Sequence, residues 1–215
     1  MKKSIDALPL RNVVVDDPFW KRYVELVRGT VLPYQWDILN DRVEGAGPSC
    51  CIRNFRIAAG EIRGSFGGMV FQDSDVYKWI EAVAYSLCMC PDAKLEALAD
   101  GAIDIICAAQ QPDGYLNTYY IINGLEKRFT FLRDHHELYC LGHLIEAAVA
   151  YYRSTGKRKL LDAAIRFADC VCGIFGTGEN QIPGYPGHEI IELALVKLYR
   201  LTGDKKYLRL AVFFI

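Results

Sequence analysis

The sequence lacks any long hydrophobic run and any excess of charge of one sign. No segment approaches the roughly 18 consecutive apolar residues that a membrane-spanning helix needs, so no membrane span is expected. The 25 Lys and Arg residues nearly balance the 26 Asp and Glu residues, and the formal net charge is -1. Without a basic face for phosphates, nucleic acid is not an expected partner. The composition therefore favours a neutral or small-molecule partner.

The cysteines also lack the spacing of a disulfide scaffold or a zinc ribbon. Eight are present, but no two of them form a Cys-x-x-Cys pair. Adjacent Cys50 and Cys51 follow the turn-like segment 45–48, where we expect more exposure and assign no role. Four others occupy helical patterns where alanine would serve, which is typical of buried free thiols in a reducing compartment: Cys88, Cys107, Cys140 and Cys170.

The N-terminus has only the beginning of a signal peptide. Met1-Lys2-Lys3 supplies the basic start, but the segment from Ser4 to Leu10 contains an aspartate and a proline where the apolar core of a signal peptide would lie. We therefore expect the protein to be cytoplasmic.

Hydrophobic residues recur at helical spacing along most of the chain, and no alternating strand pattern competes with them. Short turns at Pro91-Asp92, Gly156 and Gly203 separate paired helical segments. Asp16 or Asp17 would cap an earlier helix that begins at Pro18. The sequence thus predicts an all-α fold of helical hairpins, with paired segments at about 76–90 and 95–106, 138–152 and 160–168, and 189–198 and 207–211.

Two of these hairpins repeat each other. The segment from Tyr151 to Leu161 aligns with that from Leu198 to Leu208 at an offset of 47, since 203 minus 156 is 47. Long connections at about 110–134 and 176–187 are rich in aromatic residues or in glycine and proline, and they lie opposite the short turns. Stacked hairpins would place these elaborated loops on one face, where a functional site is expected.

The stretch from Gly67 to Trp79 is the strongest candidate binding segment, because a glycine-containing loop leads there into a helix. Its mixture of aromatic and polar side chains suits a sugar, whose ring has apolar C–H faces and a rim of hydroxyls. In the alternative interpretation, Asp73 and Ser74 cap the helix and the aromatic residues belong to the core. The candidate binding residues are Phe71, Gln72, Asp73, Asp75 and Trp79.

The residues from Leu208 to Ile215 form an apolar run within a helical pattern, with no polar cap and no terminal glycine. We expect a further helix to cover this edge, so the chain is interpreted as cut short. An uncovered edge of this kind would also promote self-association.

With these motifs the chain resembles glycoside hydrolase family 127, the β-L-arabinofuranosidases, from about Pro18 to its last residue. The resemblance implies that residues 1–215, without an internal domain boundary, form the N-terminal half of an (α/α)6 toroid. The matching segments are Val31 to Trp36, Ala58 to Glu61, Gly68 to Trp79, Ala109 to Leu116, His136 to Tyr139, Gly142-His143, Ile145 to Tyr151, Gly187-His188 and Ile191 to Tyr199.

The resemblance further implies an exo-acting, retaining glycosidase that releases terminal β-L-arabinofuranose from plant-derived oligosaccharides. In the family, a cysteine nucleophile is bound to zinc together with further cysteines and a glutamate, and another glutamate is the proposed acid/base. These groups belong to the second half of the toroid, and none of the cysteines here matches them. Catalytic residues and zinc ligands are therefore expected beyond residue 215, and this fragment alone is expected to be inactive and to bind no metal.

His136 and His188 match family positions that hydrogen-bond the arabinofuranose hydroxyls, and each lies where a loop enters a helix. As neutral imidazoles they would each offer one donor and one acceptor. In the alternative interpretation they make only local backbone bonds at helix starts. The segment from Arg42 to Cys51 departs from the family pattern, in which a polar residue also reaches the sugar.

Other interpretations remain open at this stage. His136, Cys140 and His143 share one helix face and could imitate a metal site, although His143 precedes a core-like run and is expected to be a satisfied interior histidine. Glu137 and Glu146 could perform acid/base work, but the sequence identifies no partner for either. The chain could instead be a non-catalytic sugar-binding or scaffold fragment, or part of another (α/α)6 glycosidase.

Overall fold

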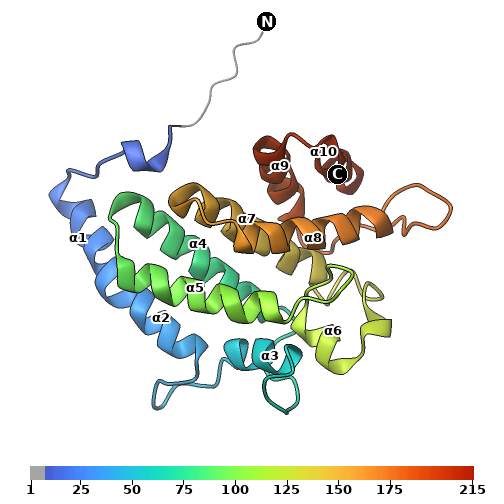
Figure 1. Cartoon of the computed structure of the whole chain (residues 1–215), viewed down its shortest axis with the longest axis horizontal. Coiled ribbons are helices and arrows are strands. Elements are labelled where there is room, and N and C mark those ends of the chain that lie inside the picture. The colour runs from blue at the N-terminus through green and yellow to red at the C-terminus, as the bar shows by residue number, and fades with distance from the viewer. Residues whose placement is uncertain (1–7) are drawn as a thin grey trace, which may run out of the picture.

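A computed structural model describes residues 8–215 and confirms the predicted all-α fold (Figure 1). The start of the suspected signal sequence, Met1-Lys2-Lys3, lies outside the described residues. The helices are α1 (Pro18–Leu26), α2 (Leu32–Leu39), α3 (Cys51–Ala58), α4 (Asp73–Met89), α5 (Ala93–Ala108), α6 (Thr118–Asn123), α7 (Glu137–Thr155), α8 (Lys159–Ile174), α9 (Ile191–Thr202) and α10 (Lys205–Phe214). A π-helical segment, Val27–Val31, joins α1 to α2.

The six longest helices pair as predicted into three hairpins, α4/α5, α7/α8 and α9/α10. Helix α7 packs between α4 and α9, and α8 packs between α5 and α10. The hairpins therefore stack in two rows, with α1 and α2 on one side and α9 and α10 on the other (Figure 1). This two-layered arrangement is consistent with part of an (α/α)6 toroid.

The short turns follow from local chemistry. Gly156 and Gly203 both have a φ of 77°, and each donates its N–H to the carbonyl four residues earlier at 2.8 Å. A left-handed residue at this position ends a helix, and glycine adopts it without steric cost. At the turn between α4 and α5, the side chain of Asp92 accepts hydrogen bonds from the first-turn N–H groups of α5.

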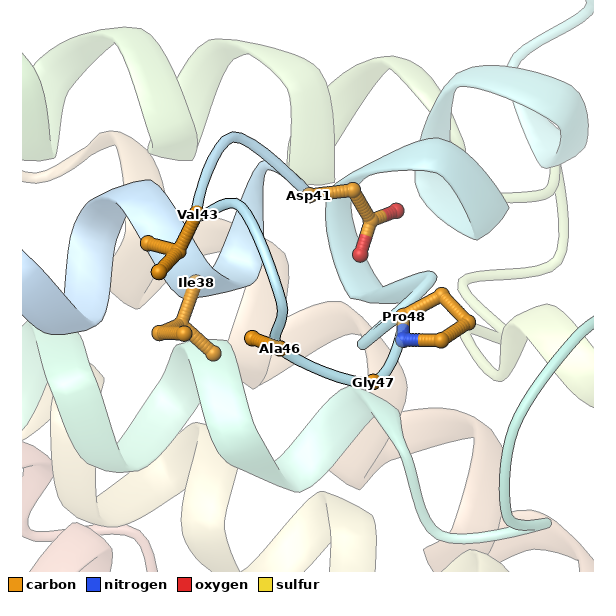
Figure 2. Close-up of a pocket in the computed structure, with 6 residues that line it drawn as sticks. All are labelled: Ile38, Asp41, Val43, Ala46, Gly47 and Pro48. Carbon is orange, nitrogen blue, oxygen red and sulfur yellow. The ribbon is translucent and has the colours of Figure 1, made fainter.

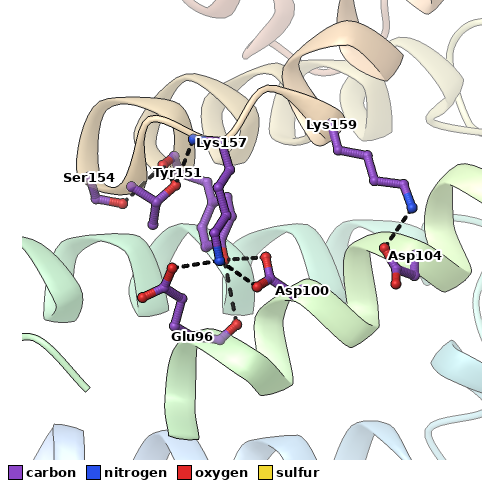
Figure 3. A network of polar contacts seen from close by, with 8 residues as sticks. Glu96, Asp100, Asp104, Tyr151, Ser154, Lys157 and Lys159 are labelled. Atoms are coloured by element: carbon purple, nitrogen blue, oxygen red, sulfur yellow. Dashed lines mark hydrogen bonds and ion pairs between the residues drawn. The ribbon is translucent and has the colours of Figure 1, made fainter. Parts of the chain in front are cut away.

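A polar network joins the α7/α8 hairpin to α5 (Figure 3). The Lys157 ammonium lies 2.5 Å from an Asp100 oxygen and 2.6 Å from a Glu96 oxygen, and the Tyr151 hydroxyl donates to the other Asp100 oxygen at 2.8 Å. Because the three charged side chains are 33–44% exposed, each ion pair contributes roughly 0–1 kcal/mol. The contacts nevertheless link the turn between α7 and α8 directly to α5.

The long connections lead into the N-termini of α4, α7 and α9, at the end opposite the short turns. The connection between α5 and α7 contains a helix that the sequence pattern did not predict, α6, which begins where the Asn117 side chain accepts from the Tyr120 N–H at 3.3 Å. Among residues 8–215, no helix combines the length and apolar character needed to span a bilayer.

Candidate functional site

Three loop-to-helix junctions meet at one end of the stacked hairpins. Phe71 precedes α4, His136 is the residue before α7, and His188 precedes α9. The ring centroid of His136 lies 5.3 Å from that of Phe71 and 5.9 Å from that of His188. The structure therefore brings together three predicted binding residues that are far apart in the sequence.

The backbone fixes the tautomer of both histidines. The His136 Nδ1 lies 2.7 Å from the Asp134 carbonyl oxygen, and the His188 Nδ1 lies 2.8 Å from the Glu189 carbonyl oxygen. Because a carbonyl oxygen can only accept, the neutral ring must carry its hydrogen on Nδ1, and its Nε2 is an acceptor. The local backbone bonds of the alternative interpretation are therefore present, and they leave the Nε2 of each ring unused. Each ring offers an outside ligand one acceptor, rather than the predicted donor and acceptor.

Tyr139 lies at the centre of this junction, and sequence reasoning did not select it. Its ring centroid is 4.7 Å from His188, 5.6 Å from His136 and 4.5 Å from His143. The Lys78 ammonium lies over the same ring, 5.1 Å from its centroid. The available signal was the spacing of Tyr139 from His136 and from His143, three and four residues, because such a spacing brings side chains together at the start of a helix.

His143 differs from its prediction as a satisfied interior histidine. Its Nδ1 is buried, and no group within the described chain hydrogen-bonds to it. Burial, together with the nearby Lys78 and His188, lowers the pKa of His143 to about 4, so the ring is neutral at physiological pH. Its predicted alternative role in a metal site also finds no support, because no three His, Cys, Asp or Glu side chains gather for a metal ion within residues 8–215.

Gln72 and Asp75 form a pair at the start of α4. The Gln72 side-chain amide donates to an Asp75 oxygen at 2.6 Å and accepts from the Met69 N–H at 3.1 Å. Asp75 is half-buried, and burial raises its pKa although Lys78 opposes the shift. Gly68 has a φ of 87°, and a Cβ there would meet the Gln72 side chain at 2.5 Å, so glycine allows this pair to form.

The structure places Asp73 and Trp79 in the core, so we do not retain them in the candidate site. Asp73 accepts from the Thr118 N–H at 2.7 Å and from the Thr118 hydroxyl at 2.5 Å, which ties α4 to α6. Burial raises the pKa of Asp73 to about 6. The Trp79 indole donates to the Leu32 carbonyl at 2.9 Å and stacks on Trp36 at 4.6 Å. Asp73 is also not the predicted helix cap, because α4 begins at this residue and no side-chain cap bond is formed.

The two glutamates of α7 have partners that the sequence did not reveal. Glu137 accepts from the Tyr115 hydroxyl at 2.5 Å and from the Phe129 N–H at 2.8 Å, and burial raises its pKa to about 7. It thereby fastens the connection before α7 and helps to place His136. Glu146 is paired with Lys197 of α9, and burial raises its pKa as well.

The segment from Arg42 to Cys51 folds back onto the end of α2. Asp41, with a φ of 57°, accepts from the Ser49 N–H at 2.6 Å and from the Cys50 N–H at 3.1 Å. Cys50 and Cys51 are only 7% and 0% exposed, so their predicted exposure is wrong. Figure 2 shows the pocket of about 100 Å³ that results, lined by Ile38, Asp41, Val43, Ala46, Gly47 and Pro48.

Comparison with known proteins identifies the family of the chain. The family model described as the β-L-arabinofuranosidase GH127 catalytic domain matches residues 12–215. The non-reducing end β-L-arabinofuranosidase of Bifidobacterium longum subsp. longum is 46% identical over 220 residues, which cover 95% of this chain and 33% of that protein.

Two solved structures extend the comparison. The crystal structure of a GH127 β-L-arabinofuranosidase from Geobacillus stearothermophilus T6 is 61% identical, with a TM-score of 0.93 over 94% of this chain and 32% of that one. Another GH127 β-arabinofuranosidase is 41% identical, with a TM-score of 0.88 over 97% of this chain and 33% of that one. The chain spans about a third of the length of these relatives. The chain belongs to glycoside hydrolase family GH127, the β-L-arabinofuranosidase family.

Proposed function

We propose that this chain forms the sugar-binding wall of a retaining glycosidase that releases terminal β-L-arabinofuranose from oligosaccharides. Family membership and the activities named for its relatives support this proposal. The observation that carries it is the convergence of His136 and His188, whose Nδ1 atoms are held by the backbone while their Nε2 atoms remain as acceptors.

The junction matches the surface chemistry of a furanose. Two hydroxyls of the sugar would donate to the Nε2 atoms of His136 and His188, and the Asp75 carboxylate offers a further acceptor. The aromatic ring of Phe71 would contact the apolar C–H face of the sugar. In this role the chain binds and orients the sugar, and none of its described residues performs bond cleavage.

Two buried cysteines, Cys51 and Cys140, do not fit the zinc site that the family resemblance implies. The Cys51 thiol faces the Gln72 carbonyl at 3.3 Å, and the Cys140 thiol faces the Phe71 carbonyl at 3.7 Å. Burial raises the pKa of both thiols well above the ordinary value, which disfavours the thiolate that binds metal. We propose that the zinc ligands, the nucleophile and the acid/base belong to sequence beyond residue 215. We also place the protein in the cytoplasm, because its eight cysteines are free thiols.

Titration of the chain with methyl β-L-arabinofuranoside, followed by NMR, tests the proposed wall. We expect weak but saturable binding that His136→Ala and His188→Ala each abolish. His135→Ala is the matched control, since that neighbouring ring instead contacts the Tyr120 hydroxyl at 2.7 Å and stacks on Phe131. Saturable binding that survives both histidine substitutions would contradict the proposed wall, and no binding by the unmodified chain would favour a scaffold.

The activity itself is tested on a polypeptide that continues beyond residue 215. In the presence of zinc it should release L-arabinose from β-L-arabinofuranosyl oligosaccharides, while residues 1–215 alone should release none. Release of a different sugar, with no arabinose, would overturn the specificity and favour another (α/α)6 glycosidase.

A further inference from the structure

We infer that Tyr139 is a positioning residue that holds the His136 and His188 imidazoles in the orientation that binds sugar. This inference rests on the proposed function, because it assigns Tyr139 a task within the same wall. Tyr139 is half-buried in the first turn of α7, and its ring contacts both imidazoles, which come from separate loop-to-helix junctions.

The backbone bonds alone leave both histidines incompletely fixed. A hydrogen bond from Nδ1 to a carbonyl sets the tautomer, but the ring can still rotate about that bond. A second contact against the ring removes this freedom. Tyr139 supplies such a contact to His136 at 5.6 Å with an interplanar angle of 79°, and to His188 at 4.7 Å with an angle of 58°. Both edge-to-face and tilted arrangements are favourable for aromatic pairs.

The α4 hairpin in turn holds Tyr139. The Lys78 ammonium donates to the Ser74 hydroxyl at 3.1 Å and lies 5.1 Å from the Tyr139 ring centroid, within range of a cation–π interaction. Phe71 meets the same ring edge to face at 6.5 Å. Tyr139 also packs against His143, with ring centroids 4.5 Å apart, and the His143 ring is neutral and does not repel Lys78.

One aromatic ring therefore links three hairpins at the site. The groups that surround it come from the α4 junction, from α7 itself and from the α9 junction. A side chain that merely filled space would need only shape, whereas this position also needs an aromatic face for the cation and for the two imidazoles. A phenylalanine at position 139 should therefore preserve the orientation of the two imidazoles, and a leucine should not.

NMR of the ¹⁵N-labelled imidazoles tests this role without any sugar. In Tyr139→Phe, the side-chain signals of His136 and His188 should stay as in the unmodified chain. In Tyr139→Leu, both should shift and broaden as the rings gain rotational freedom. Tyr152→Leu is the matched control, because Tyr152 lies on the same helix under Arg158, away from the junction. Unchanged His136 and His188 signals in Tyr139→Leu would overturn the inference.

Sugar affinity provides the second readout. Tyr139→Leu should weaken binding of methyl β-L-arabinofuranoside about tenfold, and Tyr139→Phe should stay within about twofold of the unmodified chain. If the unmodified chain bound no arabinoside, the proposed function would fail while the imidazole signals still tested the positioning role. Should Tyr139→Leu not fold, Tyr139→Met takes its place with the same expected and contradicting results.

Discussion

Replacing Asp73 by asparagine should change how the stability of the chain depends on pH. Asp73 is buried between α4 and α6, where both of its oxygens accept hydrogen bonds from Thr118. Asparagine can keep both contacts, because its carbonyl accepts from the Thr118 N–H while its amide donates to the hydroxyl, which then acts as an acceptor. The substitution therefore removes a buried charge and leaves the geometry intact.

The magnitude follows from the pKa of Asp73. Burial raises this pKa from 3.8 to about 6 in the folded chain. At 1.36 kcal/mol for each pH unit, the difference corresponds to roughly 3 kcal/mol. Because the folded pKa is the higher one, this stability is fully present below pH 3.8 and is lost as the pH rises through about 6. Between pH 4.5 and 7.5 the loss from this group amounts to about 2 kcal/mol.

Urea unfolding followed by tryptophan fluorescence measures this effect. The free energy of unfolding of Asp73→Asn, minus that of the unmodified chain, should increase by about 2 kcal/mol between pH 4.5 and pH 7.5. Titrating groups that do not interact with Asp73, including Glu137, behave alike in both proteins and cancel in this difference. Asp73→Ala is the contrasting variant, and it should destabilise the fold at both pH values because it leaves the Thr118 N–H buried and unbonded. A difference for Asp73→Asn that does not change with pH would refute the reasoning.

Three further perturbations test other features. Glu137→Ala should lower the free energy of unfolding by roughly 2–4 kcal/mol, because the Tyr115 hydroxyl and the Phe129 N–H lose their acceptor, and Glu137→Gln should recover part of this loss in urea unfolding. Gly156→Ala should lower the free energy of unfolding by roughly 1–2 kcal/mol in thermal unfolding, because the left-handed φ of 77° is strained for alanine. The added Cβ itself would contact no other atom within 4 Å, so an unchanged stability would contradict this argument. The chain should self-associate in light scattering, and Val212→Lys, at a side chain that is 65% exposed, should reduce the apparent mass; an unchanged mass would exclude this face.

The sequence by itself determined the paired helices, their arrangement in hairpins and the family, although not the short helix α6. These features depend on interactions between residues that are close together in the sequence. Asp17 accepts from the first N–H groups of α1 at 2.9 Å with Pro18 beside it, and Gly156 and Gly203 end their helices in the same conformation. Apolar residues at helical spacing then dictate which face of each helix is buried.

Only the tertiary structure decided what the polar and aromatic side chains of the site do. Asp73 accepts a hydrogen bond from Thr118, 45 residues away, and Trp79 donates one to the Leu32 carbonyl, 47 residues away. Both residues therefore lie in the core and not in the predicted site. Tyr139 was added to the candidate site because the ring of His188, which precedes another hairpin, contacts its ring. Hydrogen-bond partners and burial are set by contacts between distant segments, and these contacts exist only once the hairpins have packed against one another.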